Sequence, residues 1–125
     1  MDIESLRAYC LSFPDATENI QWGHDLCFKV GGKMFTVAAL EVDAAPRLCF
    51  KCSPDTFAEL IEREGMAPAP YVGRYNWVGL EALDTLRAAE LKVLIASSYD
   101  LVVSKLPKKA MKKKKARRLK KRLPR

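Results

Sequence analysis

The sequence predicts an α+β domain in which an antiparallel sheet of about four or five strands packs against helices. Three observations support this class. The chain has 125 residues, 49% of them hydrophobic, which suits one domain with a modest core. An alternating apolar pattern predicts a β-hairpin near residue 31, and helical spacing of apolar residues predicts helices near both ends. The expected order of elements is α-β-β-β-α-β-α.

The hairpin is the strongest local signal in the chain. Leu26, Phe28 and Val30 alternate with other residue types, which is the two-residue period of a half-buried strand. Gly31-Gly32 follows, and a tight hairpin turn needs residues that accept a positive φ. Residues 33–40 are the expected returning strand.

An amphipathic helix is predicted over residues 2–12. Ile3, Leu6 and Cys10 fall at helical spacing, and Asp2 suits the positive end of a helix dipole. Pro14 ends this helix, and the loop that follows leads to the hairpin.

A third strand is predicted at residues 47–52, followed directly by a second helix. Ser53 is a favoured N-cap residue, and Pro54 is favoured at the first helical position. Gly65 is expected to end this helix in the left-handed conformation.

The remaining elements are predicted from proline, glycine and apolar spacing. Residues 66–73 contain two prolines and predict an irregular loop, and residues 74–80 predict a fourth strand. We expect Asp84 or Thr85 to cap the last helix, which runs to about residue 104.

Charge divides the chain into two parts. Of its 22 basic residues, thirteen lie between Lys105 and Arg125, where there is no acidic residue. The rest of the chain has nine basic and fifteen acidic residues, a net charge of −6. We therefore expect a folded domain over residues 1–107 and a disordered polybasic tail over residues 108–125, with a polyanion as partner. The alternative is a solvated tail that only aids solubility.

Several classes of protein are excluded by what the sequence lacks. It has no apolar run as long as a membrane span and no signal-peptide pattern, so we expect a cytoplasmic protein without membrane contact. Cys49 and Cys52 have the C-x-x-C spacing, but in a strand their side chains leave on opposite faces, so we expect no metal and no cofactor. His24 is the only histidine, and its neighbour Asp25 would point the other way in a strand. We predict no catalytic residue and no enzyme activity.

One face of the predicted sheet combines positive charge with aromatic rings. If the apolar residues of the strands face the helices, Lys29, Arg47 and Lys51 lie on the opposite, open face. Tyr75 and Trp77 of the fourth strand would share that face. Cations beside exposed rings suit phosphate neutralisation and base stacking. The alternative is an ordinary solvated face on which the preceding loop covers Trp77.

Four motifs stand in the following order along the chain: Trp22–Phe35, Leu48–Pro54, Pro70–Val78 and Ser98–Pro107. Together they resemble the MmcQ/YjbR-like family over most of the predicted domain. The resemblance implies a frataxin-like (CyaY-like) α+β fold and a DNA-binding role, and it supplies no catalytic residue. Many members of that family carry a histidine immediately before the tryptophan of the fourth strand. This chain has Asn76 there, so no role of that histidine is carried over.

We therefore expect a non-enzymatic, monomeric protein that binds DNA, with RNA as the second choice of partner, and that associates with the nucleoid. The tail supplies most of the affinity with little sequence preference, and the domain positions it. The predicted binding residues are Lys29, Lys33, Arg47, Lys51, Arg74, Trp77, Lys108, Lys109, Lys112, Lys113, Lys114, Lys115, Arg117, Arg118, Lys120, Lys121 and Arg122.

Two other functions fit the sequence. One is a small-ligand or protein-interaction module, whose cleft would lie near Trp22, His24, Tyr71, Arg74 and Trp77. The other is a metal-handling role, suggested by the frataxin-like shape alone, for which the candidates are Glu59, Glu62 and Glu64.

Overall fold

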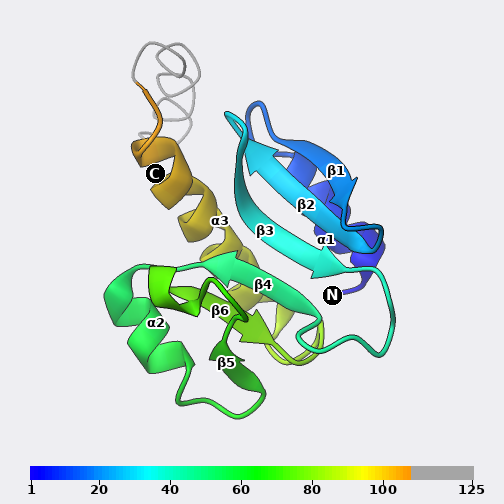
Figure 1. Cartoon of the computed structure of the whole chain (residues 1–125), viewed down its shortest axis with the longest axis vertical. Helices are drawn as coiled ribbons and strands as arrows, with labels where there is room; N and C mark the ends of the chain where they lie inside the picture. Colours follow the sequence, from blue (N-terminus) through cyan, green and yellow to red (C-terminus); the bar gives the residue numbers. More distant parts are fainter. Residues whose placement is uncertain (108–125) are drawn as a thin grey trace.

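A six-stranded antiparallel sheet with helices on one face forms the described part of the chain (Figure 1). The computed structural model describes residues 1–107, and the predicted tail, residues 108–125, lies outside the described residues. The α+β class is confirmed, with six strands rather than four or five. The elements in chain order are α1 (Ile3–Leu11), β1 (Thr17–Gln21), β2 (Asp25–Val30), β3 (Lys33–Ala39), β4 (Leu48–Lys51), α2 (Pro54–Leu60), β5 (Met66–Pro68), the 3₁₀ helix η1 (Gly73–Tyr75), β6 (Trp77–Leu80) and α3 (Ala88–Ser104).

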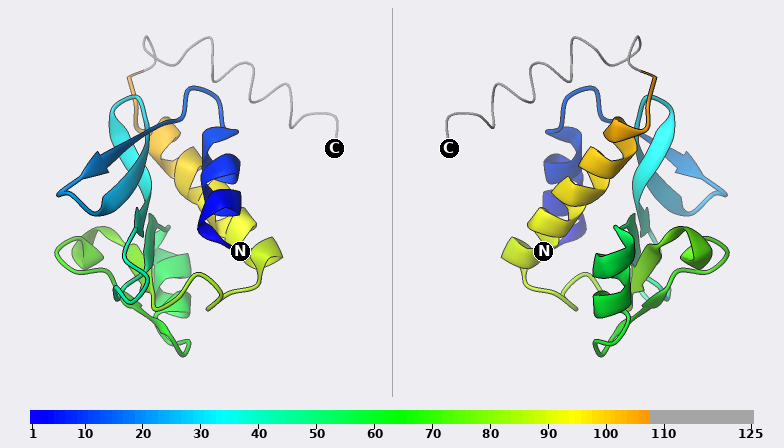
Figure 2. Two further views of the ribbon diagram at one scale, coloured as in Figure 1. Left: turned by 90° about the vertical axis from the view of Figure 1, so that its right-hand side faces the viewer. Right: turned by 90° about the vertical axis from the view of Figure 1, so that its left-hand side faces the viewer.

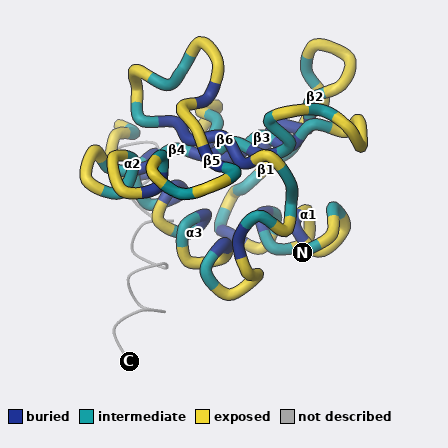
Figure 3. The backbone as a smooth tube through the Cα atoms, turned by 90° about the horizontal axis from the view of Figure 1, so that it is seen from below, coloured by how far each residue is buried: buried dark blue, intermediate teal, exposed yellow. Residues whose placement is uncertain are grey.

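The strands lie in the order β1-β2-β3-β4-β6-β5, and all neighbouring pairs are antiparallel. α3 packs over β2, β3 and β4, and α2 packs against β6. α1 lies beside α3 (Figure 2), where the hydroxyl of Tyr9 donates a 2.9 Å hydrogen bond to the carbonyl oxygen of Lys92. Figure 3 shows α1 and α3 on one side of the sheet and exposed loops on the other. We call these sides the helix-covered face and the helix-free face.

The hydrophobic core lies between the sheet and the helices, because alternate strand residues point to that side. Phe28 of β2, Phe50 of β4 and Val78 of β6 are fully buried there. Phe13, just after α1, stacks on Tyr99 of α3 with ring centroids 4.7 Å apart. Such aromatic pairs add about 0.5–1.5 kcal/mol beyond the burial of their area, so this contact helps fasten α1 to α3.

A serine of α3 supplies hydrogen bonds at the point where β3 and β4 part. Phe35 has no partner in β2, which marks a β-bulge, and the pairing of β3 with β4 ends at Thr36 and Phe50. The hydroxyl of Ser98 donates to the carbonyl oxygen of Phe35 (2.6 Å) and accepts from the backbone N–H of Lys51 (3.0 Å). One buried hydroxyl therefore satisfies two backbone groups of separate strands.

The predicted hairpin is confirmed. β2 and β3 are joined by Gly31 and Gly32, whose φ angles of 58° and 79° lie in the left-handed region. A Cβ atom at Gly31 would lie 2.6 Å from Cδ1 of Leu106, so the turn contacts the chain that follows α3. A side chain at this position would strain the turn and displace Leu106.

The predicted start of α2 is confirmed, and its predicted end is wrong. Ser53 is the N-cap, its hydroxyl accepts from the N–H of Thr56 (3.2 Å), and Pro54 opens the helix. α2 ends at Leu60, before Gly65. The positive φ of Gly65 (81°) instead lets the chain turn into β5.

The predicted cap of α3 is also wrong. The helix begins at Ala88, a few residues after Asp84 and Thr85. The hydroxyl oxygen of Thr85 accepts a 2.9 Å hydrogen bond from the N–H of Ala82, which closes a separate turn before the helix. Among the described residues, no helix is long and apolar enough to cross a bilayer.

Two edge strands and one short helix were not expected from the sequence. β1 follows the loop that begins at Pro14, and β5 lies in the segment predicted to be irregular. Arg74 and Tyr75 belong to η1 and not to the fourth strand. Asn76 takes the left-handed conformation (φ 68°), which separates η1 from β6, so the strand begins at Trp77.

Candidate nucleic-acid interface

The middle of the helix-free face is lined by small residues rather than by cations. Cys27, Val37, Cys49 and Gly79 pair in one row across β2, β3, β4 and β6. A Cβ atom at Gly79 would lie 2.9 Å from Cβ of Pro46, so the loop before β4 lies directly on this row. The face that was expected to be open is therefore covered in part by this loop.

Arg47 is engaged in holding that loop. Its Nε donates to the carbonyl oxygen of Ala39 (2.9 Å), and one terminal nitrogen donates to the carbonyl oxygen of Val42 (3.2 Å). A guanidinium with two backbone partners is fixed in place and has fewer donors left for a phosphate. Arg47 therefore helps to fix the conformation of the loop before β4.

Trp77 is buried, contrary to the expectation that it shares an open face with Tyr75. It is 8% exposed and lies outside the main core cluster, on the opposite side of β6 from Val78. The N–H of Ala69 donates to the carbonyl oxygen of Trp77 (2.9 Å), so the segment after β5 runs along this strand. The buried position fits the alternative interpretation, in which Trp77 is covered.

Near the end of β4, Lys51 and Arg74 both contact Tyr75. The ammonium of Lys51 donates a 3.1 Å hydrogen bond to the carbonyl oxygen of Tyr75. The guanidinium of Arg74 lies over the ring of Tyr75, 4.9 Å from its centroid. Burial lowers the pKa of Lys51 from its ordinary value, and the nearby positive charge of Lys105 lowers it further. We call Lys51, Arg74 and Lys105 the cationic cluster.

The hairpin places two further lysines beside the end of the described chain. Lys29 is half-buried and Lys33 is exposed, and they flank the glycine turn on which Leu106 packs. The chain therefore leaves the domain between this turn and the cationic cluster. The following predicted binding residues lie outside the described residues: Lys108, Lys109, Lys112, Lys113, Lys114, Lys115, Arg117, Arg118, Lys120, Lys121 and Arg122.

The residues of the alternative cleft lie on separate parts of the sheet. Trp22 and His24 occupy the turn between β1 and β2, whereas Tyr71 and Arg74 lie between β5 and β6. Strands β2 and β6 are three inter-strand spacings apart, about 14 Å. His24 Nδ1 lies 3.1 Å from a carboxylate oxygen of Asp25. The expectation that these neighbours point apart is wrong, because His24 is in a turn and not in the strand.

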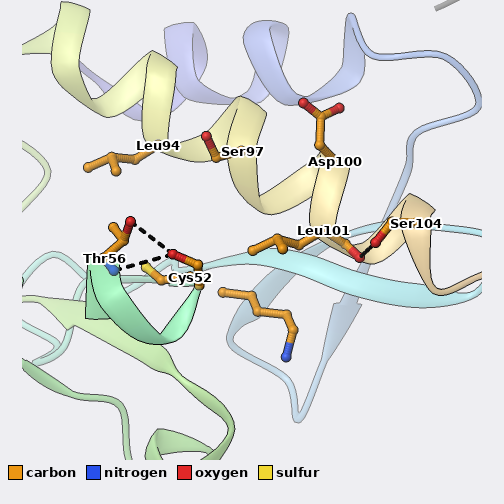
Figure 4. Close-up of a pocket in the computed structure, with 9 residues that line it drawn as sticks. Cys52, Thr56, Leu94, Ser97, Asp100, Leu101 and Ser104 are labelled. Atoms are coloured by element: carbon orange, nitrogen blue, oxygen red, sulfur yellow. Dashed lines mark hydrogen bonds between the residues drawn. The ribbon is translucent and has the colours of Figure 1, made fainter. Parts of the chain in front are cut away.

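A hollow of about 380 Å³ lies between α3 and the N-terminal end of α2 (Figure 4). The hydroxyl of Ser53 donates to the hydroxyl of Thr56 (3.0 Å), and that of Ser104 donates to the carbonyl oxygen of Leu101 (2.7 Å). Burial raises the pKa of the Cys52 thiol to about 12, which keeps it protonated near neutral pH. The hydroxyls of Ser53, Thr56 and Ser104 thus form hydrogen bonds within the helix ends, and burial disfavours the thiolate of Cys52. The lining residues are Lys51, Cys52, Ser53, Thr56, Leu94, Ser97, Asp100, Leu101 and Ser104.

One of the three acidic residues considered for metal handling, Glu59, forms an ion pair. Arg63 forms 2.8 Å ion pairs with Glu59 of the same helix region and with Glu90 of α3. Within residues 1–107 no three His, Cys, Asp or Glu side chains are grouped to hold a metal ion. Glu59 therefore links α2 to α3 through Arg63.

Comparison with known proteins gives a family. The family model described as YjbR matches residues 11–101. The chain belongs to the YjbR family. It is similar to the crystal structure of Deinococcus radiodurans protein DR2400, which carries the domain DUF419, with a TM-score of 0.77 and 25% identity over 90% of this chain and 86% of that one. A Pseudomonas syringae protein from structural genomics shares the fold, with a TM-score of 0.67 and 19% identity over 81% of this chain and 98% of that one. No curated protein matches the chain significantly.

The YjbR match includes part of the cationic cluster. Lys51 and Arg74 lie inside the matched range, whereas Lys105 and the basic run after it follow the range. The sequence does not single out Lys105 as a binding residue, because there it is only the first member of the basic run. Its charge acts on Lys51, which lies 54 positions earlier in the chain, a relation that no local pattern signals.

Proposed function

We propose that this YjbR-family protein is a non-enzymatic protein that binds nucleic acid, DNA before RNA, with little sequence preference. The observation that carries the proposal is the cationic cluster, in which Lys51 and Arg74 both contact Tyr75 and the charge of Lys105 acts on Lys51. Two like charges held close together repel in the free protein. A phosphate placed beside both replaces this repulsion with attraction, so the arrangement favours an anionic ligand.

The basic segment after the cluster extends this effect. Residues 108–125 hold twelve basic residues and no acidic residue. Lysine and arginine neutralise backbone phosphates and release counterions, and phosphate contacts carry no sequence information. In this proposal the domain fixes where the segment starts, and the segment supplies most of the affinity. The protein acts as a monomer in the cytoplasm, in association with the nucleoid.

A salt-dependent titration of the full chain tests the proposal. Fluorescence anisotropy with a labelled random duplex should show affinity falling roughly 10³- to 10⁵-fold between about 50 and 200 mM salt, if about 6–10 phosphates are contacted. Replacing Lys112–Lys115 by glutamine should reduce the slope of log affinity against log salt by about 0.9 for each residue that contacts a phosphate. Lys51→Gln and Lys105→Gln should each reduce it by about 1.

Arg87→Gln is the matched control, because Arg87 is an exposed cation at the opposite end of α3 from Lys105. It should leave both affinity and salt slope unchanged. An unchanged slope after neutralising Lys112–Lys115 would show that the basic segment is only solubilising. A cluster variant that behaves like the Arg87 control would remove the cluster from the interface.

A further inference from the structure

Two exposed tyrosines, Tyr71 and Tyr75, lie on either side of Arg74 in the chain. Tyr71 is 98% exposed and Tyr75 is 52% exposed, although both are large aromatic residues. The guanidinium of Arg74 lies over the ring of Tyr75. The backbone carbonyl oxygen of Tyr75 accepts a hydrogen bond from the ammonium of Lys51. Both rings and the guanidinium of Arg74 thus belong to one short stretch of chain between β5 and β6, and Lys51 of β4 is bonded to that stretch.

The conformation of Tyr71 is costly for the fold. Its φ is 67°, in the left-handed region that a bulky side chain enters only with strain. Asp15 and Asn76 share a positive φ, but short polar side chains accept it readily. The nearly complete exposure of Tyr71 means that its ring returns little packing energy. Trp22 has the same two features, but only Tyr71 lies in the stretch that also holds Arg74 and Tyr75, so the strain at Tyr71 is the one that a ligand contact would explain.

The stretch that carries the rings is held firmly. A Cβ atom at Gly73 would lie 2.8 Å from Cβ of Pro68, so η1 is packed closely on β5. The N–H of Tyr75 donates to the carbonyl oxygen of Val72 (3.0 Å), and the N–H of Ala69 donates to that of Trp77 (2.9 Å). Figure 2 shows this stretch projecting from the sheet on the side away from α1 and α3. A rigid platform loses little entropy when a ligand binds to it.

We propose that Tyr71 and Tyr75 form a stacking platform for unpaired bases, so that the domain binds single-stranded nucleic acid in preference to duplex. The inference rests on the proposed function and names the form of nucleic acid that the same site takes. Unpaired bases expose their faces to aromatic side chains, whereas a duplex keeps those faces stacked inside. Lys51 and Arg74 are placed to neutralise the phosphates that link the stacked bases.

The experiment compares three labelled ligands of equal length with the full chain: oligo-dT, a duplex, and an abasic strand that keeps the phosphates and lacks the bases. Tyr71→Ala and Tyr75→Ala should each weaken oligo-dT binding by roughly 5- to 100-fold, which corresponds to the loss of one stacked base. Binding of the duplex and of the abasic strand should change less than about twofold. Tyr71→Phe keeps the ring and should retain oligo-dT affinity.

Trp22→Ala is the matched control, since Trp22 is also exposed (63%) with a positive φ (55°) but lies away from the cluster on the turn between β1 and β2. The inference is overturned if the two tyrosine variants lose no more oligo-dT affinity than this control, or if the parent binds oligo-dT and the abasic strand alike. A salt-sensitive duplex affinity would then still stand, and with it the proposed function. A protein that binds none of the three ligands overturns both proposals.

Discussion

The two faces of the sheet differ in the size of their side chains and in the place of their charges. The helix-covered face carries large apolar residues such as Phe28 and Phe50, which are completely buried. The helix-free face has Cys27, Val37 and Cys49 in its middle row and keeps its cations at the borders. Its exposed aromatic residues lie in the turns that border it and not on its strands.

This difference separates the residues that stabilise the fold from those of the proposed binding site. Large buried side chains contribute most of the free energy of folding, so the helix-covered face tolerates little change. The segments that border the helix-free face are fixed by a few hydrogen bonds, such as those of Arg47 and Lys51 to carbonyl oxygens. Residues in these segments are available for a ligand, because the rigid sheet holds them in position and their replacement does not disturb the core.

The largest effect on stability is expected from the helix-covered face. Phe50→Ala should lower the free energy of unfolding by about 3–5 kcal/mol, because it leaves a cavity under α3. Val37 of β3 lies on the helix-free face, and Val37→Ala should lower the free energy of unfolding by about 1 kcal/mol or less, since Val37 is only half-buried. Urea denaturation followed by circular dichroism measures both. Equal losses for the two variants would contradict the division between the faces.

A smaller effect is expected from Ser98, where α3 meets the sheet. Ser98→Ala removes the hydroxyl that bonds to Phe35 and Lys51, and leaves two backbone groups without that partner. An unsatisfied buried polar group costs about 1–3 kcal/mol, so the variant should lose that much stability. Ser97→Ala, at the next and exposed position of the same helix, should change stability by less than about 0.5 kcal/mol. A Ser98 variant as stable as the Ser97 variant would show that the bridge is dispensable.

The parts of the fold that the sequence predicts are those with strong local chemistry. The alternation of Leu26, Phe28 and Val30 and the glycine pair after them predict the hairpin because burial on one face requires that pattern. Ser53 and Pro54 likewise predict the start of α2. The edge strands escape prediction for the opposite reason. β1 reads Thr-Glu-Asn-Ile-Gln, mostly exposed, and pairs with β2 through its backbone rather than through an apolar pattern.

The candidate site was harder to predict because its geometry depends on long-range contacts. The sequence pointed to Lys51 and Arg74, and the structure brings both to Tyr75. It gave no sign that Asn76 would turn the chain and end the strand before Trp77. That single change of backbone conformation places Tyr75 outside the strand while Trp77 is covered. The period of two residues does not hold there, because residues 74–80 are not all in one strand.

The smallest expected change in stability comes from the two strained aromatic residues at the borders of the helix-free face, Trp22 and Tyr71. Trp22 and Gly23 are the central residues of a turn closed by the N–H of His24 and the carbonyl oxygen of Gln21, and both have positive φ. Asn-Gly is the preferred pair in turns that need two positive φ angles. Trp22→Asn should therefore raise the free energy of unfolding by about 0.5–1 kcal/mol, since the exposed ring contributes little packing.

Tyr71→Asn should give a similar gain in stability for the same reason, because its φ is 67° and its ring is exposed. The two variants are expected to differ in binding: the Trp22 variant keeps its affinity for oligo-dT, and the Tyr71 variant loses it. Thermal melts and anisotropy titrations on the same preparations measure both quantities. If both variants gain stability and neither loses affinity, the strain at Tyr71 serves no nucleic acid. If the Tyr71 variant is instead destabilised, its ring packs in the fold and the strain argument for a binding role fails.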